Sequence, residues 1–367
     1  MSLSIGIVGL PNVGKSTLFN ALLKRQQAFV ANFPFATIEP NIGIVPVPDP
    51  RLKELAEIVK ESEGMETPPP IVPATVKFVD IAGLVAGAHK GEGLGNKFLA
   101  HIRETTAVCH VLRLFEDPNA AREGSGDPEE DLEIVETELK LADLSTLEKQ
   151  TEPRGVADKD EQARWAVVVK LRQALESGAP AREVALDENE KEIAQTLNLL
   201  TAKPILVALN VGEGDLRQAG EIEKKYAKGL GVYEDQIVVI CAKLEMELAQ
   251  LPEEEQKNYL AEYTIQESGL ERLIRKAYTT LSLISFLTAG EKEVRAWTIE
   301  KATSAKKASG AIHSDFEQFF IKADVIPWEE FVSVGGWKVA REQGKVRSEG
   351  KDYLVKDGEV IEFKIGR

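Results

Sequence analysis

Short apolar runs rich in valine and isoleucine recur along the first two thirds of the chain. They cover residues 4–10, 41–47, 76–81, 108–115, 205–210 and 237–242. Runs of this length that alternate with helical patterns are typical of buried strands in a mostly parallel sheet. The pattern therefore predicts an α/β fold.

A long segment without such runs separates the fourth and fifth of them, and its apolar positions recur at helical spacing. These positions are Leu132, Val135, Leu139 and Ala142, and then Trp165, Val168, Leu171 and Leu175. We expect a coiled-coil-like helical hairpin over 127–200, inserted into the α/β domain. Two ordinary surface helices are the alternative, because the heptads are too few to decide.

The pattern changes again near residue 283. Polar and apolar residues alternate in 293–299 and 353–365, with helical character between them. Asp357-Gly358 is a turn signal, so the second stretch is predicted to be a β-hairpin with this tip. The chain thus divides into residues 1–126 with 201–282, an insert over 127–200, and a small α+β domain over 283–367.

The composition is that of a globular protein. The chain has 367 residues, of which 43% are hydrophobic, enough for the cores of about two or three domains. No stretch approaches the ~18 uninterrupted apolar residues of a membrane span, and the first residues lack the features of a signal peptide. We expect a soluble, cytoplasmic protein with no membrane partner, in which Cys109 and Cys241 are small buried hydrophobic residues without a disulfide.

The net charge of −15 argues against a general nucleic-acid binder, but it is unevenly distributed. Residues 127–200 hold 19 acidic and 9 basic side chains, a net charge of −10, whereas residues 283–367 hold 14 of each. The balanced region contains a basic cluster made of Lys338, Arg341, Lys345, Arg347 and Lys351. This cluster is either a solvated face, which is the commoner case, or a place where RNA binds.

The strongest chemical signal is a complete GxxxxGK[ST] motif over residues 9–16, directly after the first predicted strand and before a helical pattern. In this phosphate-binding loop, backbone N–H groups surround the phosphates, the lysine reaches the β- and γ-phosphates, and the hydroxyl binds Mg²⁺. A chance glycine turn is the alternative. The expected nucleotide-binding residues are Asn12, Val13, Gly14, Lys15, Ser16 and Thr17, with Ser16 also a metal ligand.

The parts of a nucleotide switch follow in order. Asp80 begins a DxxG motif at the end of the third run, and we expect it to bind Mg²⁺ through water while the Gly83 N–H senses the γ-phosphate. Thr37 stands before the second run, where a switch threonine would complete the Mg²⁺ shell. Read alone, Asp80 could be a helix cap and Thr37 a surface loop residue. The glycine-rich stretch 87–96 is expected to reorder with the γ-phosphate.

The base-recognition residues depart from the usual GTPase pattern. Asn210-Val211-Gly212-Glu213 stands where Asn-Lys-x-Asp is expected, so the aspartate that accepts two hydrogen bonds from guanine is missing. Asn210, Val211 and Glu213 are still expected to line the pocket, with Cys241 and Ala242 in its last loop. Loss of a bidentate acceptor removes much of the preference for guanine, so ATP is predicted to be the better substrate. A GTPase that uses Glu213 as a poor substitute is the alternative.

The catalytic residue is left open. Leu84 stands where a water-orienting glutamine is common, and a leucine can neither orient nor deprotonate water, so slow intrinsic hydrolysis is expected. His89, His101 and His110 are available, but His110 lies in an apolar run and His101 on the polar face of a predicted helix. Asn12 could coordinate K⁺ that supplies positive charge; a hydrogen bond that braces the loop is the alternative.

Taken together, these residues resemble the Obg-like ATPases of the YchF type over the whole chain. The motifs are GLPNVGKSTLFNAL, NFPFATIEPN, DIAGL followed by KGEGLGNKFL, the NxxE pocket and the C-terminal AGEKEVRAWTI. The resemblance implies a Ras-like P-loop domain, an inserted antiparallel α-helical domain and a C-terminal α+β TGS domain of β-grasp form. It also implies preference for ATP over GTP, stimulation by K⁺, and association with ribosomes. One departure is Arg122-Glu123-Gly124, where the family often carries a histidine that is a candidate for the missing catalytic role. An arginine cannot act as a base at neutral pH, although it could stabilise charge.

The function expected from these observations is a slow, Mg²⁺-dependent ATPase that acts as a nucleotide-dependent switch in translation or the stress response. Its expected partners are ATP and the ribosome, including large-subunit rRNA and ribosomal proteins, with weak homo-oligomerisation as a further expectation. Lys15 and Gly83 are the expected catalytic contacts to the γ-phosphate. A GTP-specific enzyme of ribosome assembly, and a nucleotide-gated adaptor whose hydrolysis is incidental, are the alternatives.

Overall fold

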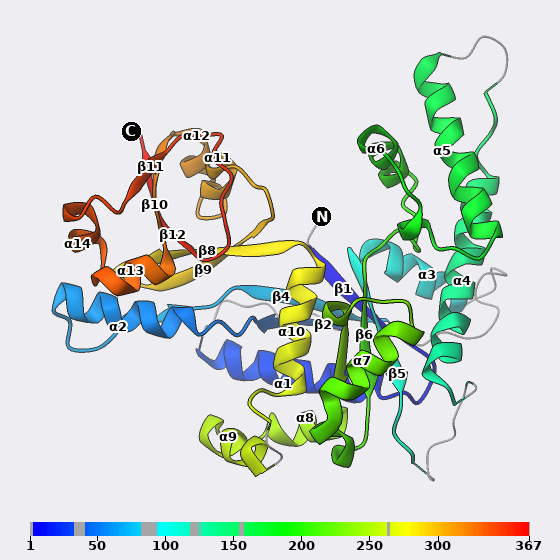
Figure 1. Cartoon of the computed structure of the whole chain (residues 1–367), viewed down its shortest axis with the longest axis horizontal. Helices are drawn as coiled ribbons and strands as arrows, with labels where there is room; N and C mark the ends of the chain where they lie inside the picture. Colours follow the sequence, from blue (N-terminus) through cyan, green and yellow to red (C-terminus); the bar gives the residue numbers. More distant parts are fainter. Residues whose placement is uncertain are drawn as a thin grey trace. The chain divides into compact units, whose positions relative to one another are not determined.

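The computed structural model describes residues 3–32, 41–81, 94–117, 124, 126–153, 158–262 and 265–366 (Figure 1). The chain divides into two compact units. The first consists of Met1–Ile44 and Lys77–Lys276, and the second of Val45–Val76 and Ala277–Arg367. In the part of the chain given by these ranges, no helix is long and apolar enough to cross a membrane.

A six-stranded sheet forms the centre of the first unit, in the order β2-β4-β1-β5-β6-β7. Its strands are β1 (Ser4–Val8), β2 (Ile42–Pro46), β4 (Thr75–Asp80), β5 (Ala107–Arg113), β6 (Ile205–Asn210) and β7 (Ile237–Ile240). The pairs β1·β4, β1·β5, β5·β6 and β6·β7 are parallel. All six apolar runs are strands, and the predicted parallel α/β fold is confirmed.

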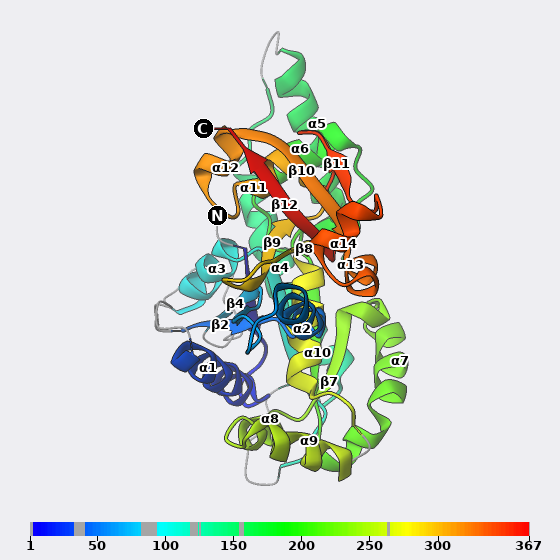
Figure 2. The same ribbon diagram turned by 90° about the vertical axis from the view of Figure 1, so that its left-hand side faces the viewer.

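Helices of this unit follow β1, β4, β6 and β7 along the chain, and they are labelled in Figure 2. They are α1 (Lys15–Asn32), α3 (Leu94–Glu104), α7 (Ala219–Gly229), α8 (Ala242–Leu248), α9 (Glu253–Glu262) and α10 (Gly269–Thr280), with short 3₁₀ turns η3 (Glu213–Gln218) and η4 (Glu234–Gln236). α1 packs on α8, and α7 packs on β7. The two cysteines are buried and free, as predicted.

The segment between β5 and β6 is helical. It contains α4 (Pro128–Glu148), α5 (Lys159–Glu176), the turn η2 (Ala181–Glu183) and α6 (Glu188–Thr196). α4 and α5 pack side by side, as the spacing predicts, but α6 also packs on α5, so the insert is more than a hairpin. Its core includes Leu147, Val168, Leu171 and Leu175, together with Leu197 and Leu199 from the returning chain.

One buried carboxylate fixes the returning chain to α4. Asp143 accepts hydrogen bonds from the Leu200 and Thr201 N–H groups, both at 2.8 Å, and from the Thr201 hydroxyl at 2.7 Å. Burial raises the pKa of Asp143, against these hydrogen bonds, which favour its ionised form. The returning chain is therefore held in register where it re-enters the sheet.

The second unit contains a mixed six-stranded sheet in the order β11-β10-β12-β8-β9-β3. Its strands are β3 (Ile71–Val72), β8 (Leu283–Ala289), β9 (Val294–Glu300), β10 (Phe320–Pro327), β11 (Arg347–Glu349) and β12 (Glu359–Ile365). Its helices are α2 (Arg51–Glu63), α11 (Ala305–Ser309), α12 (Ser314–Gln318), α13 (Trp328–Val334) and α14 (Trp337–Glu342). Phe286 lies at the centre of the core, with Phe363 edge-on to it at 5.5 Å between ring centroids.

The predicted hairpin over 353–365 is wrong. β12 pairs with β10 in antiparallel and β8 in parallel orientation, not with residues 353–356. The Asp357 carboxylate accepts a hydrogen bond from the Ser285 N–H, and the Gly358 N–H donates to the Ser285 carbonyl, each at 2.8 Å. With a φ of +77°, Gly358 turns the chain onto β8 instead of back on itself.

Residues 45–76 belong to the second unit, although the sequence pattern placed them in the range 1–126. β3 pairs with β9, and α2 packs on β8, β9 and α13. Arg51 holds Asp49 through two hydrogen bonds of 2.8 Å and reaches Asp357 at 2.8 Å. A helical period does not reveal which sheet a helix covers. The three ranges drawn from the sequence remain a prediction.

Candidate nucleotide-binding site

The carboxyl ends of the parallel strands meet at one edge of the first sheet. Strand register places Ile7 beside Asp80, Arg113 beside Asn210, and Asn210 beside Ile240. In open parallel sheets, ligands bind in the crevice outside this edge. The topology therefore gathers the sequence motifs, which are far apart along the chain, at a place suited to a nucleotide.

The phosphate-binding loop connects β1 to α1 and has an unusual backbone. Asn12 and Gly14 both have positive φ values, of 59° and 98°. A Cβ atom at Gly14 would lie 2.1 Å from Asn210 Nδ2, so this position accepts only glycine. The loop then enters α1, and the amino end of a helix, with its dipole, favours an anion.

Lys15 lies inside this loop. Its side chain is buried, and Nζ donates a hydrogen bond of 2.7 Å to the Leu10 carbonyl. Ser16 follows in the first turn of α1 and is exposed, while Thr17 is half-buried. The cation and the hydroxyl are thus presented on consecutive residues, as phosphate and metal binding require.

Asp80 stands at the end of β4. Burial raises its pKa, and the positive charge of Lys15 opposes that rise. Across the described residues, no cluster of three or more His, Cys, Asp or Glu side chains could hold a metal. A P-loop Mg²⁺ needs no such cluster, because phosphate and water oxygens supply most of its ligands. The Ser16 hydroxyl and the Asp80 carboxylate are hard oxygen donors that fit this ion.

Asn210 connects two loops of the predicted base pocket. Its Nδ2 donates to the Val13 carbonyl at 2.9 Å, and its Oδ1 accepts from the Ala242 N–H at 3.0 Å. Val211 and Cys241 are buried in the adjoining hydrophobic core. The predicted pocket residues of β6 and of the loop after β7 are therefore neighbours.

Glu213, which replaces the guanine-binding aspartate, begins η3. Its Oε1 accepts a hydrogen bond of 3.2 Å from the Tyr259 hydroxyl, and the side chain is half-buried. One oxygen of this carboxylate is thus engaged by a tyrosine, which leaves fewer acceptor sites for the donors on guanine. This contact could not be predicted from the sequence, because Tyr259 lies in α9, far along the chain.

Several predicted residues lie outside the described part of the chain. They are Thr37, Gly83, Leu84, His89, Arg122 and most of the 87–96 stretch. Of the other histidines, His101 is exposed on α3 and His110 is fully buried, both as predicted.

Arg113 was not predicted to be functional. It is the last residue of β5, only 3% exposed, and its guanidinium lies among backbone carbonyls that include that of Asn12. The sequence did contain one indication of such a role. An arginine within the apolar run 108–115 is a charge in a strand predicted to be buried, and burying a charge is costly unless it is paired.

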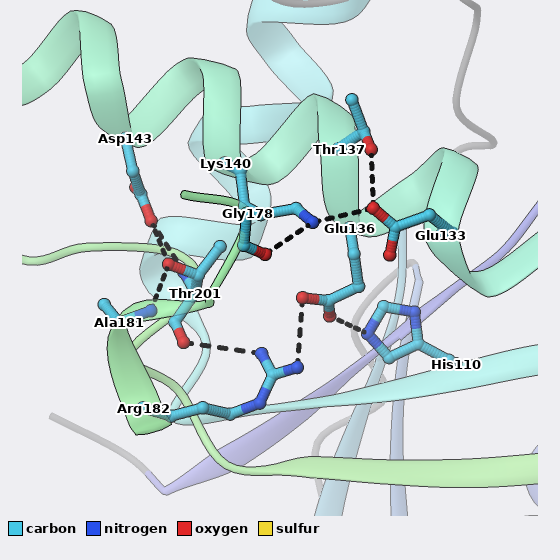
Figure 3. Close-up of polar contacts among 10 residues, drawn as sticks. All are labelled: His110, Glu133, Glu136, Thr137, Lys140, Asp143, Gly178, Ala181, Arg182 and Thr201. Atoms are coloured by element: carbon cyan, nitrogen blue, oxygen red, sulfur yellow. Dashed lines mark hydrogen bonds and ion pairs between the residues drawn. The ribbon is translucent and has the colours of Figure 1, made fainter. Parts of the chain in front are cut away.

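A second polar cluster, also missed, joins the sheet to the insert (Figure 3). His110 Nε2 of β5 lies 3.2 Å from Glu136 Oε1 of α4, and Arg182 of η2 donates to Glu136 Oε2 at 3.0 Å. Burial disfavours ionisation of Glu136, but His110 and Arg182 outweigh it and lower the pKa of this carboxyl to about 2. His110 of the nucleotide-binding sheet, three residues before Arg113, thus lies against Glu136 of the insert.

Two family models match the chain. The model described as "50S ribosome-binding GTPase" matches residues 4–140. The model for the C-terminal region of YchF GTPases, described as "Protein of unknown function (DUF933)", matches residues 283–366.

Similar proteins match over the full length. "Ribosome-binding ATPase YchF" of Bacillus subtilis is 47% identical over 374 residues, covering 99% of each chain. The protein of the same name from Haemophilus influenzae is 47% identical over 371 residues, again covering 99% of each. The solved structure of the Schizosaccharomyces pombe YchF GTPase is 35% identical, with a TM-score of 0.85 over 99% of this chain and 98% of that one.

Proposed function

The chain belongs to the YchF family, and on that premise we propose that it is a ribosome-binding ATPase. The observation that carries the proposal is the buried Lys15 inside a complete phosphate-binding loop, next to Asp80 at the same sheet edge. The full-length similarity to ribosome-binding ATPases supports both the ribosome binding and the ATPase activity that we propose.

The residues of the phosphate-binding loop and of the two switch motifs have separate roles in this proposal. Backbone N–H groups of residues 12–17 bind the phosphates, and Lys15 exchanges the Leu10 carbonyl for phosphate oxygens. Ser16 and Thr37 would hold Mg²⁺ directly, and Asp80 would hold it through water. When bound, the ion neutralises charge on the phosphates. Gly83 would contact the γ-phosphate, and Asn12 is the candidate ligand of K⁺.

The preference for ATP follows from the pocket. The Asn210 amide is already shared between Val13 and Ala242, and Glu213 accepts from Tyr259. Guanine offers two donors to an acidic acceptor, so it gains less where one oxygen of that acceptor is engaged, whereas adenine has no such pair of donors to satisfy. We propose that GTP is the weaker substrate.

The cellular role that we propose is a cytoplasmic switch in translation or the stress response, in which ATP and ADP alter binding to the large ribosomal subunit. The motif pattern alone is compatible with a GTP-specific enzyme. An adaptor with incidental hydrolysis would show turnover that neither ribosomes nor K⁺ change.

Nucleotide titrations test the enzyme. We expect tighter binding of MgATP than of MgGTP, and loss of at least about tenfold in MgATP affinity in Lys15→Met, which removes a charged hydrogen-bond donor. Lys24→Met, in the same helix but after the loop, is the matched control and should bind normally. Tighter GTP binding by the unmodified protein would refute the proposed preference.

Co-sedimentation with ribosomes tests the switch. The fraction bound should differ among ATP, ADP and no nucleotide, and the difference should disappear in Lys15→Met. Equal binding in all three conditions would refute nucleotide control while leaving the ATPase proposal standing.

A further inference from the structure

Arg113 is a buried cation that binds the backbone of three separate residues. Nε donates to the Phe115 carbonyl at 3.2 Å, Nη2 to the Asp117 carbonyl at 3.3 Å, and Nη1 lies 3.5 Å from the Asn12 carbonyl. The guanidinium also lies over the Phe115 ring, 4.5 Å from its centroid. The planar fork of arginine suits such a set of acceptors, and a lysine could not reach all of them.

A charged side chain at this position is costly to bury. Transfer of a cation from water into a protein interior is unfavourable unless hydrogen bonds replace its hydration. An apolar residue would continue the run of β5 without that cost. The carbonyls that Arg113 binds belong to the loop after β5 and, across the sheet edge, to the phosphate-binding loop.

Side chains from two neighbouring strands thus bind two consecutive carbonyls of the phosphate-binding loop. Arg113 of β5 holds the Asn12 carbonyl, and Asn210 of β6, its partner in register, holds the Val13 carbonyl. The first of these carbonyls belongs to Asn12, whose left-handed backbone an asparagine tolerates but does not prefer. Outside contacts are therefore needed to keep this conformation.

We propose that Arg113 is a positioning residue for phosphate binding: it fixes the Asn12 peptide so that the loop presents its N–H groups before nucleotide arrives. The inference rests on the proposed function and deepens it. A loop held in its binding conformation loses less conformational freedom on binding, and that saving appears as affinity for the phosphates. Arg113 itself does not touch the nucleotide in this role.

Lys203 provides a matched control at the opposite edge of the sheet. It lies just before β6, is half-buried, and its ammonium donates to the carbonyls of Arg103, at 3.2 Å, and Thr105. It therefore also binds backbone carbonyls beside β5, but at the amino end of the strands. Loss of either cation should lower the melting temperature, whereas only loss of Arg113 should affect the phosphate-binding loop.

The experiment measures MgADP affinity and thermal midpoint for the full chain and three variants. Arg113→Met is expected to bind MgADP at least about tenfold more weakly, the effect of losing one charged hydrogen bond to the loop. Lys203→Met is expected to bind within about twofold of the unmodified protein. Arg113→Lys, which keeps the charge but not the fork, is expected to be about threefold weaker.

Each outcome decides a different point. Normal affinity in Arg113→Met, or an equal loss in Lys203→Met, would overturn the positioning role. Full affinity in Arg113→Lys would show that charge alone is needed and would also overturn it. If Arg113→Met does not fold, Arg113→Lys carries the test. Absence of MgADP binding by the unmodified protein would refute the proposed function instead.

Discussion

Buried polar side chains of the first unit differ in what they bind. Lys15, Arg113 and Asn210 each bind backbone carbonyls, so the cost of removing them from water is offset. Gln26 in α1 is only 1% exposed, and neither its amide nitrogen nor its amide oxygen has a hydrogen-bond partner among the described residues. A buried amide of this kind lowers stability.

Gln26→Leu should therefore stabilise the protein. Removal of an unbonded buried amide, with a side chain of similar volume in its place, is expected to raise the free energy of unfolding by about 1–2 kcal/mol. Urea denaturation measures this change. The matched control is Gln27→Leu, at the exposed neighbouring position, which should change stability by less than about 0.5 kcal/mol. Destabilisation by Gln26→Leu would show that the amide has a partner in solution.

Single residues also show what the sequence could predict. The loop of Lys15 and Ser16 is identified by a contiguous motif, so its place at a sheet edge follows from the adjacent strand and helix. Arg113 and Glu136 act through residues distant in the chain, and their partners depend on which strands and helices become neighbours. That order is not contained in a local pattern.

At the scale of elements, the contact between β5 and α4 depends on the ionised form of Glu136. Its pKa in the folded protein, about 2, is below its usual value of 4.5. The folded state therefore holds fewer protons than the unfolded chain between these values. The stability that the contact contributes is present above about pH 4.5 and is lost as the pH falls toward 2.

Glu136→Gln tests this dependence. Relative to the variant, the unmodified protein should be more stable at neutral pH, and its advantage should shrink between about pH 5.5 and about pH 3.5. Urea midpoints at several pH values measure the difference. Glu148→Gln, at an exposed position of the same helix, is the control and should show little effect. A constant difference between Glu136→Gln and the unmodified protein would contradict the assignment.

Glu245 of α8 has a pKa shifted in the opposite direction to that of Glu136. Burial raises its pKa to about 7, although the N–H groups of Leu270 and Gly269 and the side chain of Ser268 favour the ionised form. These residues begin α10, so the carboxyl group joins α8 to that helix. The folded protein binds the extra proton between about pH 4.5 and 7, and its stability should fall as the pH rises through this range.

The corresponding variant is Glu245→Gln, which is neutral at every pH. Between about pH 5 and about pH 8 the unmodified protein should lose stability relative to this variant, as seen in urea midpoints. Glu247→Gln, at an exposed position of the same helix, is the control, and its urea midpoints should change with pH in the same way as those of the unmodified protein. If the unmodified protein gained stability relative to Glu245→Gln as the pH rose, the carboxyl group would not be protonated when folded.

The elements themselves were largely predictable, with one informative failure. Apolar runs marked the strands of the first sheet, because a strand buried on both faces is continuously apolar. Residues 353–365 alternate like a hairpin, but Asp357 and Gly358 bind Ser285 of β8. Turn residues indicate that the chain changes direction, not which strand it then meets.

On the scale of the whole molecule, contacts within the chain account for part of the uneven distribution of charge. Several acids of the strongly acidic insert cap its own helices: Asp127, Asp158 and Asp187 each accept from a backbone N–H. In the C-terminal basic cluster, Arg341, Lys345 and Arg347 pair with Glu362, Glu330 and Glu359. This pairing favours the solvated face over an RNA-binding patch, so contacts with rRNA by this cluster should depend on exposed Lys338 and Lys351.

The second unit is built from two separate stretches of chain, so a single truncation cannot remove it. Loss of residues after 276 would leave α2 without the strands β8 and β9 that it covers, and would expose Leu52, Leu55 and Val59. We expect such a truncated protein to aggregate, and light scattering and binding of a hydrophobic dye would measure this.

A second shortened version tests whether the exposed face of α2, rather than a general loss of stability, causes the aggregation. The Val47 N–H donates to the Ala74 carbonyl at 2.8 Å, so a short turn can replace residues 48–73 and remove α2 as well. This version should be less prone to aggregation than the simple truncation. Equal aggregation of the two would show that the apolar face of α2 is not responsible.

The same arrangement has a consequence for synthesis. α2 (Arg51–Glu63) is translated early, whereas β8 begins only at Leu283 and β12 ends at Ile365. Domains usually fold in the order in which they are made, but this unit must wait for the end of its own message. Until β8 and β9 have emerged, the nascent chain carries an uncovered apolar helix, and such transiently exposed surface is what chaperones bind.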